Sequence, residues 1–176
     1  RVATGYEVEL RIAVDDILPL APLLPVLAEF YEENCGTRLR LFTEVYGGTW
    51  DALFSDRADL AIGVPADGPP GGFGVRPIGE ISWQFVVAPR HPLASAPEPV
   101  PAQEILRHRA VSVADSSRTL APRTVGLLTG QDVLTVPSLH AKLAAQVAGL
   151  GVGYVPRPIA QREAAAGRLV IKQVED

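Results

Sequence analysis

The pattern of apolar and polar residues predicts alternating strands and helices over the first part of the chain. Residues 10–14 alternate between large apolar and other side chains, with the two-residue period of a half-buried strand. Residues 20–31 place leucines and aromatic residues at helical spacing, with prolines confined to the entry turns. The alternation returns over residues 38–45, and a short helix at 49–55 and a short strand at 59–64 follow. This order predicts a right-handed parallel α/β layer.

A loop separates this layer from a second group of elements. Residues 65–74 are too rich in glycine and proline for a helix or strand. Residues 83–87 alternate again, and we interpret this strand as the first crossing into a second lobe. The elements expected after it are a helix at 102–107, strands at 110–113 and 133–136, a helix from 139, a strand at 152–155, a helix at 158–166 and a strand at 169–174.

Residues 136–159 carry the clearest local signal. Ser138 is a candidate N-cap, the residues after it follow helical spacing, and Gly149 closes the helix. A short apolar run then continues until Pro156 ends it. Because a helix N-terminus carries free backbone N–H groups and a partial positive charge, the sequence predicts a place to bind a small molecule at this sheet edge.

The composition excludes several classes of protein. The 176 residues are 47% hydrophobic and 20% charged, which is typical of a folded domain rather than a disordered chain. A net charge of −4 argues against a broad basic surface for nucleic acid. No apolar run approaches the roughly 20 residues of a membrane span, and no signal peptide is evident. These features and the lone Cys35, which has no partner for an internal disulfide, predict a cytoplasmic protein.

Four segments resemble, in the expected order, the effector-binding domain of LysR-type transcriptional regulators. Residues 39–63 are similar to the family's strand, helix and DLAI strand, and residues 86–94 to its HPLA segment. Residues 136–159 are similar to the end of that domain, and the match continues over residues 151–170 to Ala-Gly-Arg-Leu-Val. The resemblance implies that the chain binds a small-molecule effector in an interlobe cleft and so modulates DNA binding and transcription by the full-length protein.

The resemblance also implies an architecture. The expected fold class is α/β, a type 2 periplasmic-binding-protein-like fold with two α/β lobes joined by two crossover strands. Lobe I is expected to take residues 1–82 and 156–176, and lobe II residues 83–155. In the family a winged helix-turn-helix DNA-binding domain precedes the effector domain, and a final strand and helix follow it. Because the chain contains no Met and begins at Arg1, we expect a fragment without these parts.

In open α/β sheets, ligands bind just beyond the carboxyl ends of the strands, and we therefore predict an effector site from the residues at those positions. The second wall of this site would also use the capped helix N-terminus at Ser138. The predicted effector-binding residues are Asp15, Asp16, Ile17, Gly47, Gly48, Thr49 and Val64 on one wall, and Asp115, Ser116, Ser117, Arg118, Pro137, Ser138 and Leu139 on the other.

Each group has a plainer structural alternative. Asp15 and Asp16 could instead cap the following helix, the Gly47–Gly48 pair could merely permit a turn, and residues 115–118 could form a solvated turn. If both walls face the cleft, the first repels a simple anion through its carboxylates, whereas the hydroxyls and guanidinium of the second attract one. The expected effector then carries an acid group at one end and an amine or hydroxyl at the other.

No motif supports an enzyme. The three histidines lack carboxylate or cysteine partners at metal-ligand spacing, and nucleophile elbows, phosphate loops and dinucleotide fingerprints are absent, so we expect no metal and no cofactor. One alternative is a free-standing solute-binding protein of a transport system, which shares the fold. Another is an enzyme on the same fold, with Asp15, Asp16 or Asp115 as the acid or base.

The expected partners follow from the first reading. Besides the effector, we expect a homo-oligomer, a dimer or a tetramer, that associates through the first lobe, with residues 20–31 and 153–161 as candidates for the interface. DNA contact is expected only through the absent N-terminal domain, and no membrane contact is expected.

Overall fold

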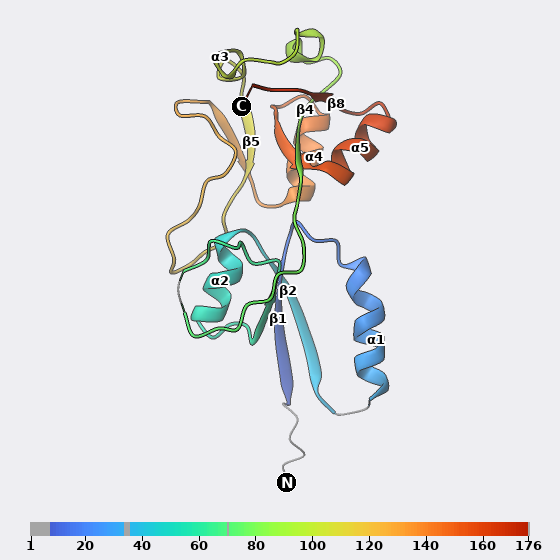
Figure 1. Cartoon of the computed structure of the whole chain (residues 1–176), viewed down its shortest axis with the longest axis vertical. Coiled ribbons are helices and arrows are strands. Elements are labelled where there is room, and N and C mark those ends of the chain that lie inside the picture. Colours follow the sequence, from blue (N-terminus) through green and yellow to red (C-terminus); the bar gives the residue numbers. More distant parts are fainter. Residues whose placement is uncertain (1–7, 34–35, 70, 176) are drawn as a thin grey trace. The chain divides into compact units, whose positions relative to one another are not determined.

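The computed structural model describes residues 8–33, 36–69 and 71–175 of the 176-residue chain (Figure 1). The chain divides into two compact units. Unit 1 comprises residues up to Pro77 together with Asp115–Arg123, and unit 2 comprises Ile78–Ala114 together with the residues from Thr124 onward. Each unit has its own sheet and helices.

Unit 1 is built on a parallel three-stranded sheet of order β2-β1-β3. The strands are β1 (Glu9–Asp15), β2 (Arg38–Glu44) and β3 (Leu60–Ile62). β1 lies in the centre, with Ile12 opposite Leu41 of β2 and Leu60 of β3. The predicted parallel layer of strand, helix, strand, helix and strand is therefore confirmed.

The helices of unit 1 lie on opposite sides of this sheet (Figure 1). α2 (Gly47–Phe54) is buried over most of its length, and its Ala52 packs against Ala13 of β1 in a small apolar core. A 3₁₀ turn, η1 (Ala21–Leu23), leads into α1 (Leu24–Glu32), where the prolines occupy the first turns as predicted. α1 contains no buried residue, so its apolar face is exposed.

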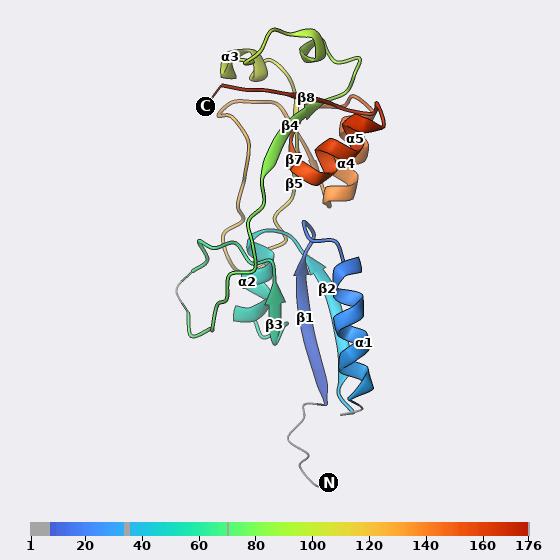
Figure 2. The same ribbon diagram turned by 45° about the vertical axis from the view of Figure 1, so that its right-hand side comes forward.

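Unit 2 is centred on β4 (Trp83–Val87), which pairs antiparallel with β7 (Gly153–Pro156) and β8 (Val170–Lys172). A second, parallel pair is formed by β5 (Ala110–Val113) and β6 (Val133–Val136). The helices α4 (Leu139–Val147) and α5 (Arg157–Ala165) lie together on one side of β4, away from α3 (Ala102–Ile105) (Figure 2). The 3₁₀ turn η2 (Pro92–Ser95) follows β4.

Side chains alternate along β4 to fill two apolar cores in unit 2. Phe85 and Val87 point into a core shared with Ile105 of α3, whereas Val86 points into a core shared with Val155 and Ala160. This two-sided burial explains why residues 83–87 are almost continuously apolar although they belong to an antiparallel sheet. The predicted strand therefore forms the centre of unit 2.

The division of the chain differs in three places from the expected lobes. Residues 156–176, expected in lobe I, fall in unit 2, because β8 forms a ladder with β4 and α5 packs beside it. The first passage between units lies at Pro77, before β4, rather than at residue 82. Residues 115–123, expected in lobe II, belong to unit 1, for reasons that are visible in their hydrogen bonds.

Local signals in the second half were accurate. Ser138 caps α4 by accepting a hydrogen bond from the Ala141 backbone N–H at 3.1 Å, and Gly149 closes the helix at φ +78°. Cys35 lies outside the described residues. Within the part of the chain that the structure describes, no helix is both long enough and apolar enough to cross a membrane.

Candidate functional site

The ends of β1 and β2 meet at the N-terminus of α2. Asp15, the last residue of β1, directs its carboxylate to two backbone N–H groups, accepting from Ile17 at 3.0 Å and from Tyr46 at 3.0 Å. Asp15 therefore does not cap α1, because the residue before that helix is Leu23, which makes no side-chain cap hydrogen bond. Asp15 instead joins the ends of two neighbouring strands. The carboxyl ends of these two strands are thus held together, and in open α/β sheets this edge is where ligands usually bind.

Tyr46, the residue directly before α2, has an unusual backbone conformation. Its φ is +49°, a region that few residues other than glycine adopt, and its side chain makes no cap hydrogen bond. The two residues after it are glycines that pack closely on other parts of unit 1. The helix therefore starts at Gly47, two residues before the predicted start, and its N-terminal N–H groups need partners from elsewhere.

One partner comes from residues Asp115–Arg123, here called the docked segment. The Gly47 N–H donates to Asp115 Oδ2 at 3.1 Å. The same carboxylate accepts from the backbone N–H groups of Ser117 and Arg123, both at 2.8 Å, and from the Ser117 hydroxyl at 2.6 Å. Asp115 thus places a negative charge at the positive end of α2 and folds the docked segment around itself.

Ser116 attaches the docked segment to the end of β2. Its backbone N–H donates to the Val45 carbonyl oxygen at 3.2 Å, and its hydroxyl accepts from the Val45 N–H at 2.7 Å. The hydroxyl in turn donates to the carboxylate of Glu44. The residue is therefore bonded through both its main chain and its side chain, which a solvated turn would not require.

Asp51 provides the deepest attachment. It lies in the middle of α2 with 0% exposure, and its Oδ1 accepts from the backbone N–H groups of Thr119 and Leu120, both at 2.8 Å, and from the Thr119 hydroxyl. Arg57 donates to Asp51 Oδ2 at 2.9 Å and also bonds the Glu44 carboxylate. Glu44, Arg57 and Asp51 form one buried network that holds the docked segment.

The pKa values follow from these contacts. Burial would raise the pKa of Asp51, but the hydrogen bonds from Thr119, Leu120 and Arg57 outweigh it and hold that pKa well below its usual range. Burial also raises the pKa of Asp15 to about 6, with the charges of Asp16 and Asp115 adding to the shift and the two backbone N–H groups opposing it. This edge therefore has a negative potential.

Tyr46 lies within that potential. Its pKa is raised, first by burial and then by the charges of Asp15, Asp115 and Asp16. Its neutral phenol is therefore the only form present near pH 7, and it offers a hydroxyl rather than a phenolate to a ligand.

The structure brings together ten of the fourteen predicted residues within unit 1. In unit 1, Gly48 packs so closely on Ser116 that a Cβ would lie 1.9 Å from its hydroxyl oxygen, and Thr49 bonds the Tyr46 carbonyl oxygen at 2.8 Å. The Arg118 side chain is exposed and projects from the docked segment. The ten are Asp15, Asp16, Ile17, Gly47, Gly48, Thr49, Asp115, Ser116, Ser117 and Arg118.

The other predicted residues are less tied to this edge. Val64 follows β3 in unit 1 and is half-buried. Pro137, Ser138 and Leu139 belong to unit 2, where they form the entrance to α4. That any of the fourteen predicted residues contacts an effector stays a prediction.

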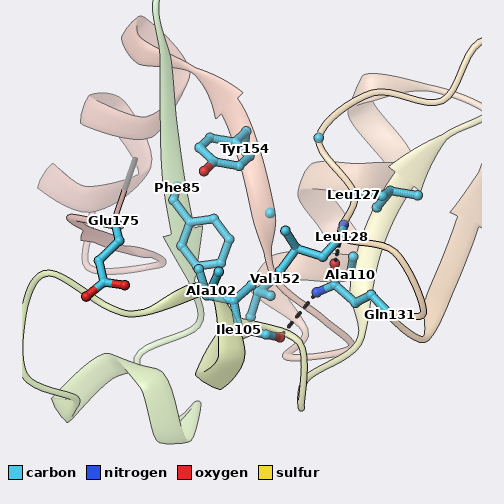
Figure 3. A pocket seen from close by; sticks show the side chains of 12 residues that line it. Phe85, Ala102, Ile105, Ala110, Leu127, Leu128, Gln131, Val152, Tyr154 and Glu175 are labelled. Atoms are coloured by element: carbon cyan, nitrogen blue, oxygen red, sulfur yellow. Dashed lines mark hydrogen bonds between the residues drawn. The ribbon is translucent and has the colours of Figure 1, made fainter.

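A small hollow lies within unit 2, and none of the predicted residues lines it. It has a volume of about 210 Å³ and is lined mainly by apolar side chains, among which Phe85 and Tyr154 meet edge to face at 5.3 Å (Figure 3). The Gln131 amide, which closes one side, donates to the carbonyl oxygens of Ile105 and His108. The polar groups of Gln131 are thus used within the protein.

Sequence reasoning missed Tyr46 as a helix start and the whole Glu44–Arg57–Asp51 network. One signal was available, because Asp51 is the single charged residue within the short apolar helix Gly47–Phe54. A buried carboxylate in such a helix must have partners. Among the described residues, no group of three or more His, Cys, Asp or Glu side chains could hold a metal ion.

Comparison with known proteins identifies the family to which this arrangement belongs. A family model described as the LysR substrate binding domain matches residues 3–176. The uncharacterized HTH-type transcriptional regulator YeeY of Escherichia coli K12 is 41% identical over 171 residues, which cover 97% of this chain and 55% of that protein. The chain spans about half to two thirds of the length of the curated relatives it matches.

Solved structures agree on the fold. The regulatory domain of MetR from Neisseria meningitidis has a TM-score of 0.66 at 19% identity, covering 95% of this chain and 78% of that one. The effector-binding domain of QuiR, solved in complex with shikimate, has a TM-score of 0.64 at 13% identity, covering 96% and 81%. These neighbours confirm the predicted type 2 periplasmic-binding-protein-like α/β class. The chain belongs to the LysR substrate-binding domain family, the effector-binding part of LysR-type transcriptional regulators.

Proposed function

We propose that the edge where β1 and β2 meet the docked segment is where this domain binds its effector. The observation that carries the proposal is the hydrogen bond from the Gly47 N–H at the start of α2 to the Asp115 carboxylate. With the bonds of Asp15 and Ser116, it brings three parts of the sequence, the end of β1, the end of β2 and the docked segment, to the carboxyl ends of the strands. Polar groups that converge at such an edge are the usual basis of small-molecule recognition in α/β folds.

The electrostatics of this edge favour one part of the expected effector. Asp15, Asp16 and Asp115 supply negative charge around the neutral phenol of Tyr46. An amine or hydroxyl suits these groups, whereas an acid group would be repelled. The effector's amine or hydroxyl end is therefore assigned to these carboxylates and Tyr46, and its acid end to the exposed guanidinium of Arg118 on the docked segment.

The docked segment offers a route from binding to regulation. The docked segment is connected to unit 2 at both ends: β5 comes just before it in the sequence, and Thr124 follows it. An effector that strengthens or replaces its hydrogen bonds changes the population of its attached state. In the longer regulator this shift would alter how the DNA-binding domain is presented, without any enzymatic step.

A ligand screen tests the proposal. We expect thermal-shift hits among small metabolites that carry an acid group and an amine or hydroxyl. Arg118→Ala is expected to weaken the best acidic hit by about 1.5 to 3 kcal/mol, the range for a hydrogen bond to a charged group, while leaving folding intact. Arg109→Ala, which removes an exposed guanidinium from unit 2, is the matched control. Hits that are all uncharged and apolar, or an unchanged Arg118→Ala variant, would contradict it.

The transport alternative is not favoured by the relatives. The curated proteins that match nearly the whole chain are HTH-type transcriptional regulators. We therefore infer a regulator's sensing domain, and the cytoplasmic location stays a prediction.

We further propose that the domain associates with itself through α1. Leu24, Val26 and Tyr31 are each more than half exposed on this helix, which contributes nothing to the described core of unit 1. The other candidate stretch, residues 153–161, lies in unit 2, where β7 is paired with β4. An exposed apolar helix face of this kind is stabilised by pairing with its own copy across a two-fold axis.

Sedimentation velocity tests this association. Val26→Glu is expected to raise the dimer dissociation constant at least about tenfold, because it places a charge in an apolar contact. Val75→Glu, at an equally exposed valine in a loop, should leave association unchanged. A strictly monomeric wild-type chain at high concentration would count against α1 as an interface.

A further inference from the structure

The hollow within unit 2 has no part in the effector site proposed above, yet its walls are firmly built. Phe85, Ile105 and Val152 line it, and all three are buried in the core that β4 shares with α3. Leu128 and Tyr154 also line it and pack against the same core. Because the packing of the core fixes these side chains, the hollow keeps its shape without a ligand.

Gln131 holds the loop that forms one wall of the hollow. Its Oε1 accepts a hydrogen bond from the Leu128 backbone N–H at 3.2 Å. Its Nε2 donates to the carbonyl oxygens of Ile105 at 3.3 Å and of His108 at 3.0 Å, which ties the loop to the end of α3 (Figure 3). Both N–H donors of this amide are thus used within the protein, so the amide has no free donor for a ligand.

The size and the lining of the hollow suit an aromatic ring. An apolar cavity of about 150 Å³ stays dry and binds benzene, because water is retained only where it finds about two to four polar partners. This hollow, at about 210 Å³, has room for such a ring and a short chain attached to it. Phe85 and Tyr154, which meet edge to face at 5.3 Å, provide ring surfaces against which an aromatic ligand can pack.

Glu175 gives the hollow its charge. It is the one charged residue among those that line the hollow, and its exposed side chain lies on the opposite side from Gln131 (Figure 3). Within the part of the chain that the structure describes, its carboxylate forms no ion pair. A ligand with an acid group is therefore repelled here and finds no basic side chain in the lining, whereas an ammonium group is attracted.

We propose that unit 2 binds a small arylalkylamine, with the aromatic ring in the hollow and the ammonium group beside Glu175. This is a second ligand site, distinct from the one proposed for the effector. The effector site uses the strand ends and the docked segment of unit 1, and its ligand carries an acid group. The site in unit 2 uses none of those residues and rejects acids.

Three probes of nearly equal size and different charge test this site on the whole chain. They are 2-phenylethylamine, which is a cation at pH 7, the neutral 2-phenylethanol, and the anion phenylacetate. In NMR titrations the amine should shift the methyl resonances of Ile105, Leu127 and Leu128, with a dissociation constant of about 1 mM or below. The alcohol should bind about two- to fivefold more weakly, as expected for one exposed ion pair, and phenylacetate more weakly still.

Glu175→Gln tests the charge. It should remove the preference for the amine over the alcohol while leaving the affinity for the alcohol unchanged. Glu80→Gln is the matched control, because Glu80 is an exposed carboxylate of the same unit that does not line the hollow. This control should keep the preference of the wild type.

Ala102→Leu tests the cavity. Ala102 lines the hollow but is exposed at the first residue of α3, so a larger side chain can enter the hollow without displacing the core. It should weaken the amine and the alcohol alike, at least about tenfold, because the added carbons occupy part of the volume that the ring needs. Ala165→Leu, at an exposed position of α5 away from the hollow, should bind both as the wild type does. Urea denaturation checks that both variants are folded.

Three results would overturn the inference. The first is the absence of methyl shifts at residues 105, 127 and 128 with about 10 mM amine. The second is equal affinity for the amine, the alcohol and phenylacetate, and the third is wild-type affinity for the amine in Ala102→Leu. Arg118→Ala, which tests the effector site, should leave amine binding unchanged, so the two proposals fail separately.

Discussion

Replacing Asp51 by alanine is expected to lower the free energy of unfolding by about 3 to 5 kcal/mol, the cost of breaking a buried charge pair by removing one partner. The substitution leaves Arg57 beside Glu44 alone and removes the acceptor for the Thr119 and Leu120 N–H groups. It therefore weakens unit 1 and releases the docked segment together. Urea denaturation measures the first effect, and hydrogen exchange at the amides of residues 119 and 120 measures the second.

Asp56→Ala provides the control for this experiment. Asp56 also pairs with an arginine, Arg11, at 3.0 Å, but its side chain is 93% exposed. Exposed pairs of this kind contribute about 0 to 1 kcal/mol, so little change in stability is expected. If Asp51→Ala cost no more than Asp56→Ala, or if exchange at residues 119 and 120 stayed slow, the buried network would not hold the docked segment.

The secondary structure of this domain was largely predictable because its signals are local. Ser138 caps α4 through a hydrogen bond to a residue three positions away, and the alternation along residues 10–14 reports the burial of one short strand. Such features are encoded within a single element. The positions of β1, β5 and β6 could therefore be given to within a residue or so.

The partition of the chain was not predictable in the same way. Residues 115–118 were placed in the second lobe because they directly follow β5. They belong to unit 1 because Asp115 and Ser116 bond Gly47 and Val45, about 70 positions earlier in the sequence. Nothing in the local pattern indicates which distant N–H group a surface aspartate will meet. The same holds for β8, whose partner β4 lies more than 80 positions before it.

The candidate site was predicted in part for a general reason. Strand ends in α/β folds gather at one edge, so residues after strands could be selected from the sequence. Whether such a residue faces a ligand or holds the protein together depends on its hydrogen bonds. Asp115 and Ser116 are engaged with unit 1, whereas Arg118 in the same segment projects into solvent. Arg118 is therefore the residue of this segment best placed to report effector binding without a loss of stability.

Gly48→Ala should be the second strongly disruptive substitution. A Cβ at this position would lie 1.9 Å from Ser116 Oγ, 2.8 Å from Glu44 Oε2 and 3.0 Å from the Ser116 carbonyl carbon, so the docked segment must move. Overpacking of this kind typically costs about 1 to 3 kcal/mol. We expect that loss in denaturation experiments, together with faster hydrogen exchange at residues 116 to 120, and a weaker response to any effector found in the ligand screen.

Two further variants locate the cause of that loss. Gly72→Ala adds the same methyl group where nothing lies within 4 Å, and it should leave stability nearly unchanged. Adding Ser116→Gly to Gly48→Ala removes the nearest clashing atom, so the double variant should be more stable than the sum of the two single changes predicts, by at least about 0.5 kcal/mol. Purely additive effects would mean that the alanine acts on helix α2 itself. The close approach of Gly48 to Ser116 would then have no part in holding the docked segment on unit 1.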